Sequence, residues 1–108
     1  MSVADTLRAA RAKIEQPEAW TKGRLAVNKR TGNSVHPKHR LATCWCAEGA
    51  IVAVEKSQAD YISALAAMER ALPPFVRLVN WNDNGFRTHA EVLALFDVAI
   101  EKSEASEK

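Results

Sequence analysis

Three stretches of the chain repeat apolar residues at the spacing of an α-helix, and each follows a helix-start signature. In this signature the hydroxyl of a serine or threonine accepts a free backbone N–H, and an acid three residues later favours the positive end of the helix. It occurs at Ser2 with Asp5, Ser57 with Asp60 and Thr88 with Glu91. The apolar positions that follow recur about every 3.6 residues, so we predict three helices.

A fourth helix is predicted from Leu41 to about Glu55. It is apolar over most of its circumference, as expected of a helix in the centre of a bundle. Four small residues share one stripe of this helix at positions i, i+4, i+7 and i+11: Ala42, Cys46, Gly49 and Ala53. Such a stripe favours the close approach of a neighbouring helix.

Short extended segments are predicted between and after these helices. Residues 25–27 and 34–35 flank a glycine-containing turn, a pattern typical of a small β-hairpin. Residues 75–79 are a second extended candidate, and residues 80–85 have the composition of a turn. The predicted fold is therefore mainly α, a small four-helix bundle with a short β-hairpin-like excursion between helices 1 and 2. Residues 1–102 are expected to form one domain, followed by a frayed polar tail over 103–108.

Composition places the chain among ordinary globular domains. Its 108 residues are 47% hydrophobic and 26% charged, close to the averages for folded proteins. No apolar run reaches the length of a membrane helix, and the first residues lack a signal-peptide pattern, so we expect a cytoplasmic protein that does not contact membrane. Cys44 and Cys46 are too close in sequence to indicate a disulfide framework, which favours a reducing compartment.

Charge is unevenly distributed, although the net charge is only +2. Residues 19–47 contain six bases and no acid, a concentration suited to phosphates. The candidate residues for binding an anion or nucleic acid are Arg24, Lys29, Arg30, Lys38, His39 and Arg40. If the central helix begins near Pro37, cations crowd its positive end, and an anion bound at that helix start would resolve the conflict. A helix that begins at Leu41 resolves it equally well. Trp20 and Trp45 bracket the basic residues 22–40, but core anchoring accounts for both, and no tryptophan, tyrosine or phenylalanine for base stacking lies between Lys22 and Arg40.

The most distinctive polar cluster consists of Asn82, Asp83, Arg87 and His89. One interpretation is that these residues line a small polar site in an enzyme. Alternatively, Asn82 and Asp83 build a turn through side-chain to backbone hydrogen bonds, with Arg87 paired to Asp83 and Trp81 anchored in the core. We favour the structural interpretation, because turn and cap chemistry accounts for every residue type present.

The two cysteines do not indicate a metal site or a nucleophile. Residues two apart on a helix point in divergent directions, so Cys44 and Cys46 would not bind zinc together with His36, His39 or His89. We expect one packed core thiol and one semi-exposed thiol, with Cys44 on the wetter helix face. Cys46 lies on the packing stripe of its helix, where a buried thiol acts as a small hydrophobic group. No metal and no cofactor are expected.

Three motifs resemble those of a known family. They are Trp45-Cys46-x-x-Gly49-Ala50, Trp81-Asn82-Asp83 and Arg87-Thr88-x-x-Glu91-Val92-Leu93. The family consists of small bacterial and phage proteins known only as a domain of unknown function, and the resemblance extends from about Leu7 to Ile100. It implies a stand-alone fold and carries no activity, cofactor or binding residue. Cys44 is not part of the family pattern.

These observations leave three classes of function. The first is a non-catalytic accessory or interaction module that acts through an unknown protein partner or a second copy of itself. The second is binding of nucleic acid or another polyanion through the basic segment 22–40. The third, which we favour least, is an enzyme that uses Cys46 or the polar cluster at residues 82–89.

Overall fold

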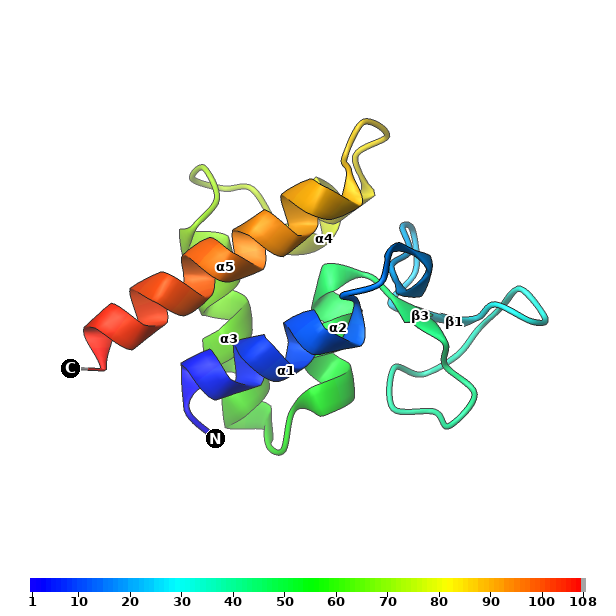
Figure 1. Cartoon of the computed structure of the whole chain (residues 1–108), viewed down its shortest axis with the longest axis horizontal. Coiled ribbons are helices and arrows are strands. Elements are labelled where there is room, and N and C mark those ends of the chain that lie inside the picture. Colours follow the sequence, from blue (N-terminus) through cyan, green and yellow to red (C-terminus); the bar gives the residue numbers. More distant parts are fainter. Residues whose placement is uncertain (108) are drawn as a thin grey trace.

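The computed structural model describes residues 1–107, which form five α-helices and a small antiparallel sheet (Figure 1). The helices are α1 (Val3–Lys13), α2 (Ala47–Val54), α3 (Gln58–Arg70), α4 (Leu78–Asp83) and α5 (His89–Ser106), with a 3-10 turn η1 at Pro17–Ala19. The strands are β1 (Ala26–Asn28), β2 (Asn33–Ser34) and β3 (Cys44–Trp45). The mainly helical class is confirmed. A pure four-helix bundle is not confirmed, because the chain also forms a fifth helix, α4, and a third strand, β3.

The three predicted helix starts are all present. The hydroxyl oxygens of Ser2, Ser57 and Thr88 accept the backbone N–H three residues ahead, at 3.1, 3.1 and 3.2 Å. At the start of α5 the contact is reciprocal, since a Glu91 carboxylate oxygen accepts the Thr88 N–H at 2.9 Å. Local sequence therefore determines where α1, α3 and α5 begin.

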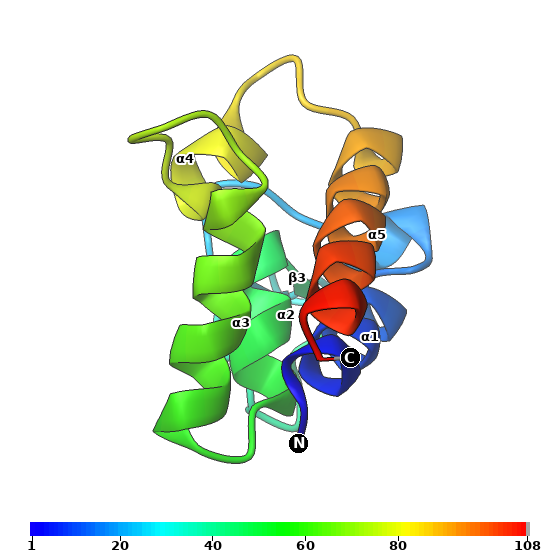
Figure 2. The same cartoon turned by 90° about the vertical axis from the view of Figure 1, so that its left-hand side faces the viewer.

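The helices pack around α1, which contacts α2, α3 and α5 (Figures 1 and 2). The largest fully buried apolar side chains come from all of these helices and include Leu7, Ile51, Met68 and Phe96. The sheet and its loops lie to one side of this helical body, on the right in Figure 1. We call the sheet and its loops the β projection. Its strands β1 and β3 are largely buried and add Ala26 and Trp45 to the hydrophobic core, whereas β2 is exposed.

The sheet confirms the predicted hairpin and adds a strand to it. Its order is β2-β1-β3, with Val27 opposite Ser34 on one side and opposite Cys44 on the other. Both pairings are antiparallel. Because β1 is the middle strand, the hairpin is fixed to the segment that leads into α2.

The predicted central helix begins six residues later than expected, at Ala47 rather than Leu41. Cys44 and Trp45 instead form β3, and the Cys46 N–H donates to the Leu25 carbonyl at 3.1 Å. A Cβ added to Gly49 would lie 1.8 Å from the Leu25 carbonyl oxygen. Gly49, one of the small residues of the predicted stripe, therefore allows the close approach of the backbone before β1, and not of a neighbouring helix.

Residues 75–85 also differ from the prediction. The expected strand and turn are replaced by α4, whose N-cap residue Arg77 makes no side-chain capping bond. The Leu78 N–H instead donates to a carboxylate oxygen of Glu69 on α3, at 2.8 Å. Because this cap comes from another helix, the local sequence gives no sign of it.

The last helix is longer than expected. α5 has 18 residues and continues to Ser106, past residue 103, where a frayed tail was predicted. Lys108 lies outside the described residues. None of the helices in residues 1–107 is both long and apolar enough to cross a membrane.

Candidate functional site

Asn82 joins three parts of the chain and is completely buried. Its side-chain oxygen accepts the Trp20 indole N–H at 2.8 Å and the Ala47 backbone N–H at 3.0 Å. Its amide nitrogen donates to the Thr21 carbonyl at 3.1 Å. Asn82 therefore fixes α4 against the start of α2 and the segment before β1.

Asp83 extends this connection toward the basic segment. Its Oδ1 accepts the Gly23 N–H at 2.8 Å and the Asn82 amide at 3.0 Å. Gly23 has a φ of 81°, which a residue with a side chain rarely adopts. The carboxylate thus holds the backbone beside Lys22 and Arg24, and does not pair with Arg87 as predicted.

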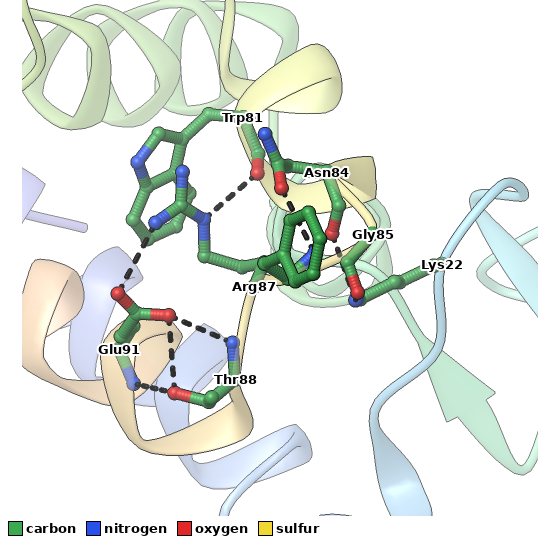
Figure 3. Close-up of polar contacts among 8 residues, drawn as sticks. Lys22, Trp81, Asn84, Gly85, Arg87, Thr88 and Glu91 are labelled. Carbon is green, nitrogen blue, oxygen red and sulfur yellow. Dashed lines mark hydrogen bonds and ion pairs between the residues drawn. The ribbon is translucent and has the colours of Figure 1, made fainter.

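Arg87 acts on the other side of α4 (Figure 3). Its guanidinium lies 3.9 Å from the centre of the Trp81 ring, and its Nε donates to the Trp81 carbonyl at 2.9 Å. Its Nη1 lies 3.3 Å from a Glu91 carboxylate oxygen. Hydrogen bonding from the Thr88 backbone N–H, with further help from Arg87, lowers the pKa of Glu91. Arg87 therefore connects the end of α4 with the capping box of α5.

His89 is the fourth residue of the predicted polar cluster, and it faces α1. Its Nε2 lies 2.6 Å from the Ile14 carbonyl, and its ring centre lies 6.0 Å from that of Trp20. A carbonyl oxygen only accepts, so this ring nitrogen carries the proton. All four cluster residues thus bind groups of the protein itself, and this geometry favours the structural interpretation.

The start of α2 offers no anion site, contrary to one of the two alternatives for the basic segment. Cys46 and Ala47 are fully buried there, and the Ala47 and Gly49 N–H groups are bound by Asn82 and the Cys46 sulfur. Lys38 lies at the opposite end, where its ammonium donates to the Glu55 carbonyl at 2.6 Å. A cation is favourable at this negative helix end, so the predicted conflict does not arise.

Both cysteines are buried, which corrects the expectation of a semi-exposed Cys44. Cys44 is 5% exposed, and its sulfur lies 3.8 Å from the Val27 carbonyl. Cys46 is the N-cap of α2, and its sulfur accepts the Gly49 N–H at 3.3 Å. Burial raises the pKa of the Cys46 thiol to about 11, against the opposing effect of that hydrogen bond.

The structure divides the basic segment into two groups. His39 and Arg40 lie with Lys38 in the exposed loop between β2 and β3. In that loop Nδ1 of His36 accepts the Lys38 N–H and Nδ1 of His39 accepts the Leu41 N–H, both at 3.0 Å. The other group is formed by half-buried Lys22 and by exposed Arg24, Lys29 and Arg30, and we call it the basic hairpin surface.

Carboxylates do not neutralise the basic hairpin surface. Of the ion pairs within residues 1–107, only Lys38–Glu55, at 3.8 Å, includes a base of segment 22–40. The Arg24 guanidinium instead donates to the Gly32 carbonyl at 2.6 Å and to the Ser34 hydroxyl at 3.2 Å. In contrast, Arg8 and Arg11 on α1 pair with Asp5, with Glu15 just after α1, and with acids of α5.

The sequence prediction missed that the turn at residues 84–86 borders this surface. The Lys22 ammonium donates to the Asn84 carbonyl at 2.8 Å and to the Gly85 carbonyl at 3.3 Å (Figure 3). The next residue, Phe86, is 95% exposed. Phe86 is distant from the basic segment in sequence, and no local signal indicates that they meet.

Other features lie elsewhere. A shallow groove of about 150 Å³ between α1, α3 and α5 is lined by residues that include Arg70 and Lys102, and by none of the predicted site residues. Within residues 1–107, no three side chains of histidine, cysteine or acid are grouped as metal ligands would be.

The fold and the site define a class: a small helical domain with a β projection whose side chains Arg24, Lys29 and Arg30 form no ion pair with a carboxylate of residues 1–107. Residues 1–102 match the model of a family of unknown function, DUF6197. The chain belongs to this family. Searches of curated proteins and of solved structures find no match.

Proposed function

We propose that this protein is a non-catalytic binding domain that contacts a polyanion, with nucleic acid as the ligand class, through the basic hairpin surface. The observation that carries the proposal is the absence of carboxylate partners for Arg24, Lys29 and Arg30 among the described residues. Cations left unneutralised on one surface attract phosphates and release counterions when they bind them.

The position of these cations supports the same function. The hairpin projects from the helical body (Figure 1), so a long polymer has access to it without meeting the helices first. Arg24 is held by the Gly32 carbonyl at 2.6 Å. A guanidinium fixed in this way keeps its charge and free N–H groups for a phosphate.

The side chains that would serve an enzyme are bound to other groups of the protein or buried. Asn82, Asp83, Arg87 and His89 hold neighbouring segments together, and Cys46 is buried with a pKa of about 11. A nucleophilic cysteine needs an accessible thiolate at neutral pH. These contacts support a non-catalytic role.

The test is salt-dependent retention on immobilised heparin of the wild type and the double variant Lys29→Gln/Arg30→Gln. Loss of two cations from the binding surface should move elution to clearly lower salt. The matched control is Arg70→Gln/Lys102→Gln, which removes the same charge from the groove between α1, α3 and α5, and it should elute close to the wild type. Wild-type elution at low salt, or equal shifts in both variants, would contradict the proposal.

A further inference from the structure

We propose that the ligand is single-stranded nucleic acid and that Phe86 stacks on one of its bases. The inference rests on the proposed function, because it requires phosphates on the basic hairpin surface. It adds the aromatic group that the basic segment lacks in sequence and that the fold supplies from a different part of the chain.

Phe86 is held on an ordered turn, residues 84–87, which we call the Phe86 turn. The Asn84 carbonyl accepts the Arg87 N–H at 2.9 Å, and the Asn84 side-chain oxygen accepts the Phe86 N–H at 2.9 Å. Arg87 is itself fixed on the Trp81 ring (Figure 3). The backbone is thus ordered on both sides of a phenyl group that is 95% exposed. Such a ring is available for stacking without the cost of ordering a loop.

A continuous set of contacts joins the Phe86 turn to the basic hairpin surface. Lys22 binds the carbonyls of Asn84 and Gly85 at 2.8 and 3.3 Å. Two residues further on, Arg24 binds the Gly32 carbonyl at 2.6 Å, in the turn between β1 and β2. That turn also carries Lys29 and Arg30, both exposed. A strand whose base stacks on Phe86 therefore has cations beside its backbone in the direction of the hairpin.

Two acids lie beside this arrangement: Glu18, whose backbone carbonyl accepts the Lys29 ammonium at 3.4 Å, and Asp83, which does not oppose binding strongly. Asp83 lies beside the surface, but its Oδ1 already accepts the Gly23 N–H at 2.8 Å and the Asn82 amide at 3.0 Å. Hydrogen bonds to both backbone and side chain partly neutralise the charge that it presents to an approaching phosphate. Its role is to position the backbone between Lys22 and Arg24.

The geometry favours a single strand over a duplex. Base faces are covered by stacking in a duplex, whereas an unpaired base offers its face to an aromatic ring. The β projection contains strands of two or three residues and no helix, so it lacks the element that usually enters the major groove of DNA. An exposed phenyl group near several cations is a combination that proteins use to bind single strands.

The test measures binding of fluorescently labelled oligonucleotides by polarisation over a range of salt concentrations. The probes are a 12-nucleotide DNA strand (about the site size of single-strand binders), the RNA strand of the same sequence, and the DNA duplex. The variants are Phe86→Ala and, as a matched control, Phe75→Ala, which removes an equally exposed phenyl group from the loop on the other side of α4.

Phe86→Ala should weaken single-strand binding by roughly 5- to 100-fold, the range expected for loss of one stacked base, whereas Phe75→Ala should bind as the wild type does. The salt dependence of binding should stay unchanged in Phe86→Ala, because no phosphate contact is lost. Tighter wild-type binding to the duplex than to both single strands would overturn the inference, and so would wild-type affinity in Phe86→Ala.

Failure of the inference is distinguishable from failure of the proposed function. If Lys29→Gln/Arg30→Gln loses heparin retention while Phe86→Ala has no effect on oligonucleotides, stacking is wrong and polyanion binding stands. If the wild type binds neither heparin nor any oligonucleotide, both are wrong. Because Phe86 is exposed, both phenylalanine variants should keep the wild-type melting temperature, which shows that any loss of binding is not unfolding.

Discussion

Asn82 shows how one polar side chain can hold distant segments together. Its amide binds the Trp20 indole, the Thr21 carbonyl and the Ala47 N–H, and the residue is completely buried. Removing a buried partner leaves the other groups without hydrogen bonds, at a cost of about 1–3 kcal/mol for each group.

We therefore expect Asn82→Ala to lower the free energy of unfolding by about 3 kcal/mol or more. Urea denaturation followed by tryptophan fluorescence would measure it. The control is Asn80→Ala, which changes an exposed asparagine on the same helix and should cost less than about 0.5 kcal/mol. Similar losses in the two variants would show that the buried hydrogen bonds contribute little.

Cys46 gives a prediction that depends on pH. Its pKa is raised from an ordinary value of about 9 to about 11 by burial, so its stabilising effect is complete below pH 9 and is lost as pH rises toward 11. The unfolded chain releases this proton first, and the linked loss of stability at about pH 10.5 is about 2 kcal/mol.

This loss should disappear in Cys46→Ser, since serine caps the helix but does not titrate in this range. The measurement compares unfolding free energies of the wild type and Cys46→Ser at about pH 8 and about pH 10.5. Other titrating groups contribute equally to both proteins, so the difference between them reports Cys46. An equal decrease in the two proteins would contradict the assignment.

Among the elements, α2 depends most on contact with the β projection. Gly49 faces the Leu25 backbone so closely that a Cβ would lie 1.8 Å from the carbonyl oxygen and 2.7 Å from the carbonyl carbon. Backbone atoms cannot move aside as a flexible side chain can, so a methyl group here must separate α2 from the segment before β1.

Gly49→Ala should consequently destabilise the protein by about 3 kcal/mol, although alanine in a helix is intrinsically favoured over glycine by about 1 kcal/mol. The sign of the change in unfolding free energy shows whether the steric clash with Leu25 or the helix propensity of alanine dominates. Gly85→Ala is the control, because a Cβ at that position meets no atom within 4 Å. Thermal melts of both variants would test the prediction, which a stabilised Gly49→Ala would contradict.

The elements differ in how far the sequence predicts them, and the difference has a physical cause. Ser2, Ser57 and Thr88 mark their helices correctly because each cap binds a residue three positions away. The start of α4 is capped by Glu69 from another helix, and the sequence therefore does not reveal it. The sequence predicts a helix over residues 44–45, and not the strand β3, because a two-residue apolar strand is too short to show alternation.

The candidate site was only partly predictable for the same reason. The excess of bases over residues 19–47 is visible in the sequence. The division of the basic segment into two groups is not visible in the sequence, because it depends on tertiary contacts. Lys38 binds the C-terminal end of α2, whereas Lys22 binds the turn that carries Phe86. Charge composition locates a basic segment, whereas tertiary contacts decide which of its cations share a surface.

At the scale of the whole molecule, the helical body and the β projection should differ in local stability. α1 packs against three other helices, and its apolar face is buried. β2 is exposed and pairs only with β1 within the described residues. Segments with few buried apolar contacts open more readily than those in the core.

Native-state hydrogen exchange should accordingly show fast exchange in residues 29–34 and much slower exchange in α1. Peptide-level mass spectrometry would resolve the two regions. Addition of a single-stranded oligonucleotide should slow exchange in the hairpin and leave α1 unchanged. Equal protection of the two regions in the free protein would contradict this division.

The contacts of Asn82 also have a consequence during synthesis. A growing chain that has not reached Asn82 contains α1, the hairpin and α2, but it lacks the acceptor for the Trp20 indole and for the first N–H of α2. Its N-terminal segments therefore cannot complete their native contacts until Asn82 has left the ribosome. We expect this domain to fold late and in one step, and to depend until then on protection of its exposed apolar surface.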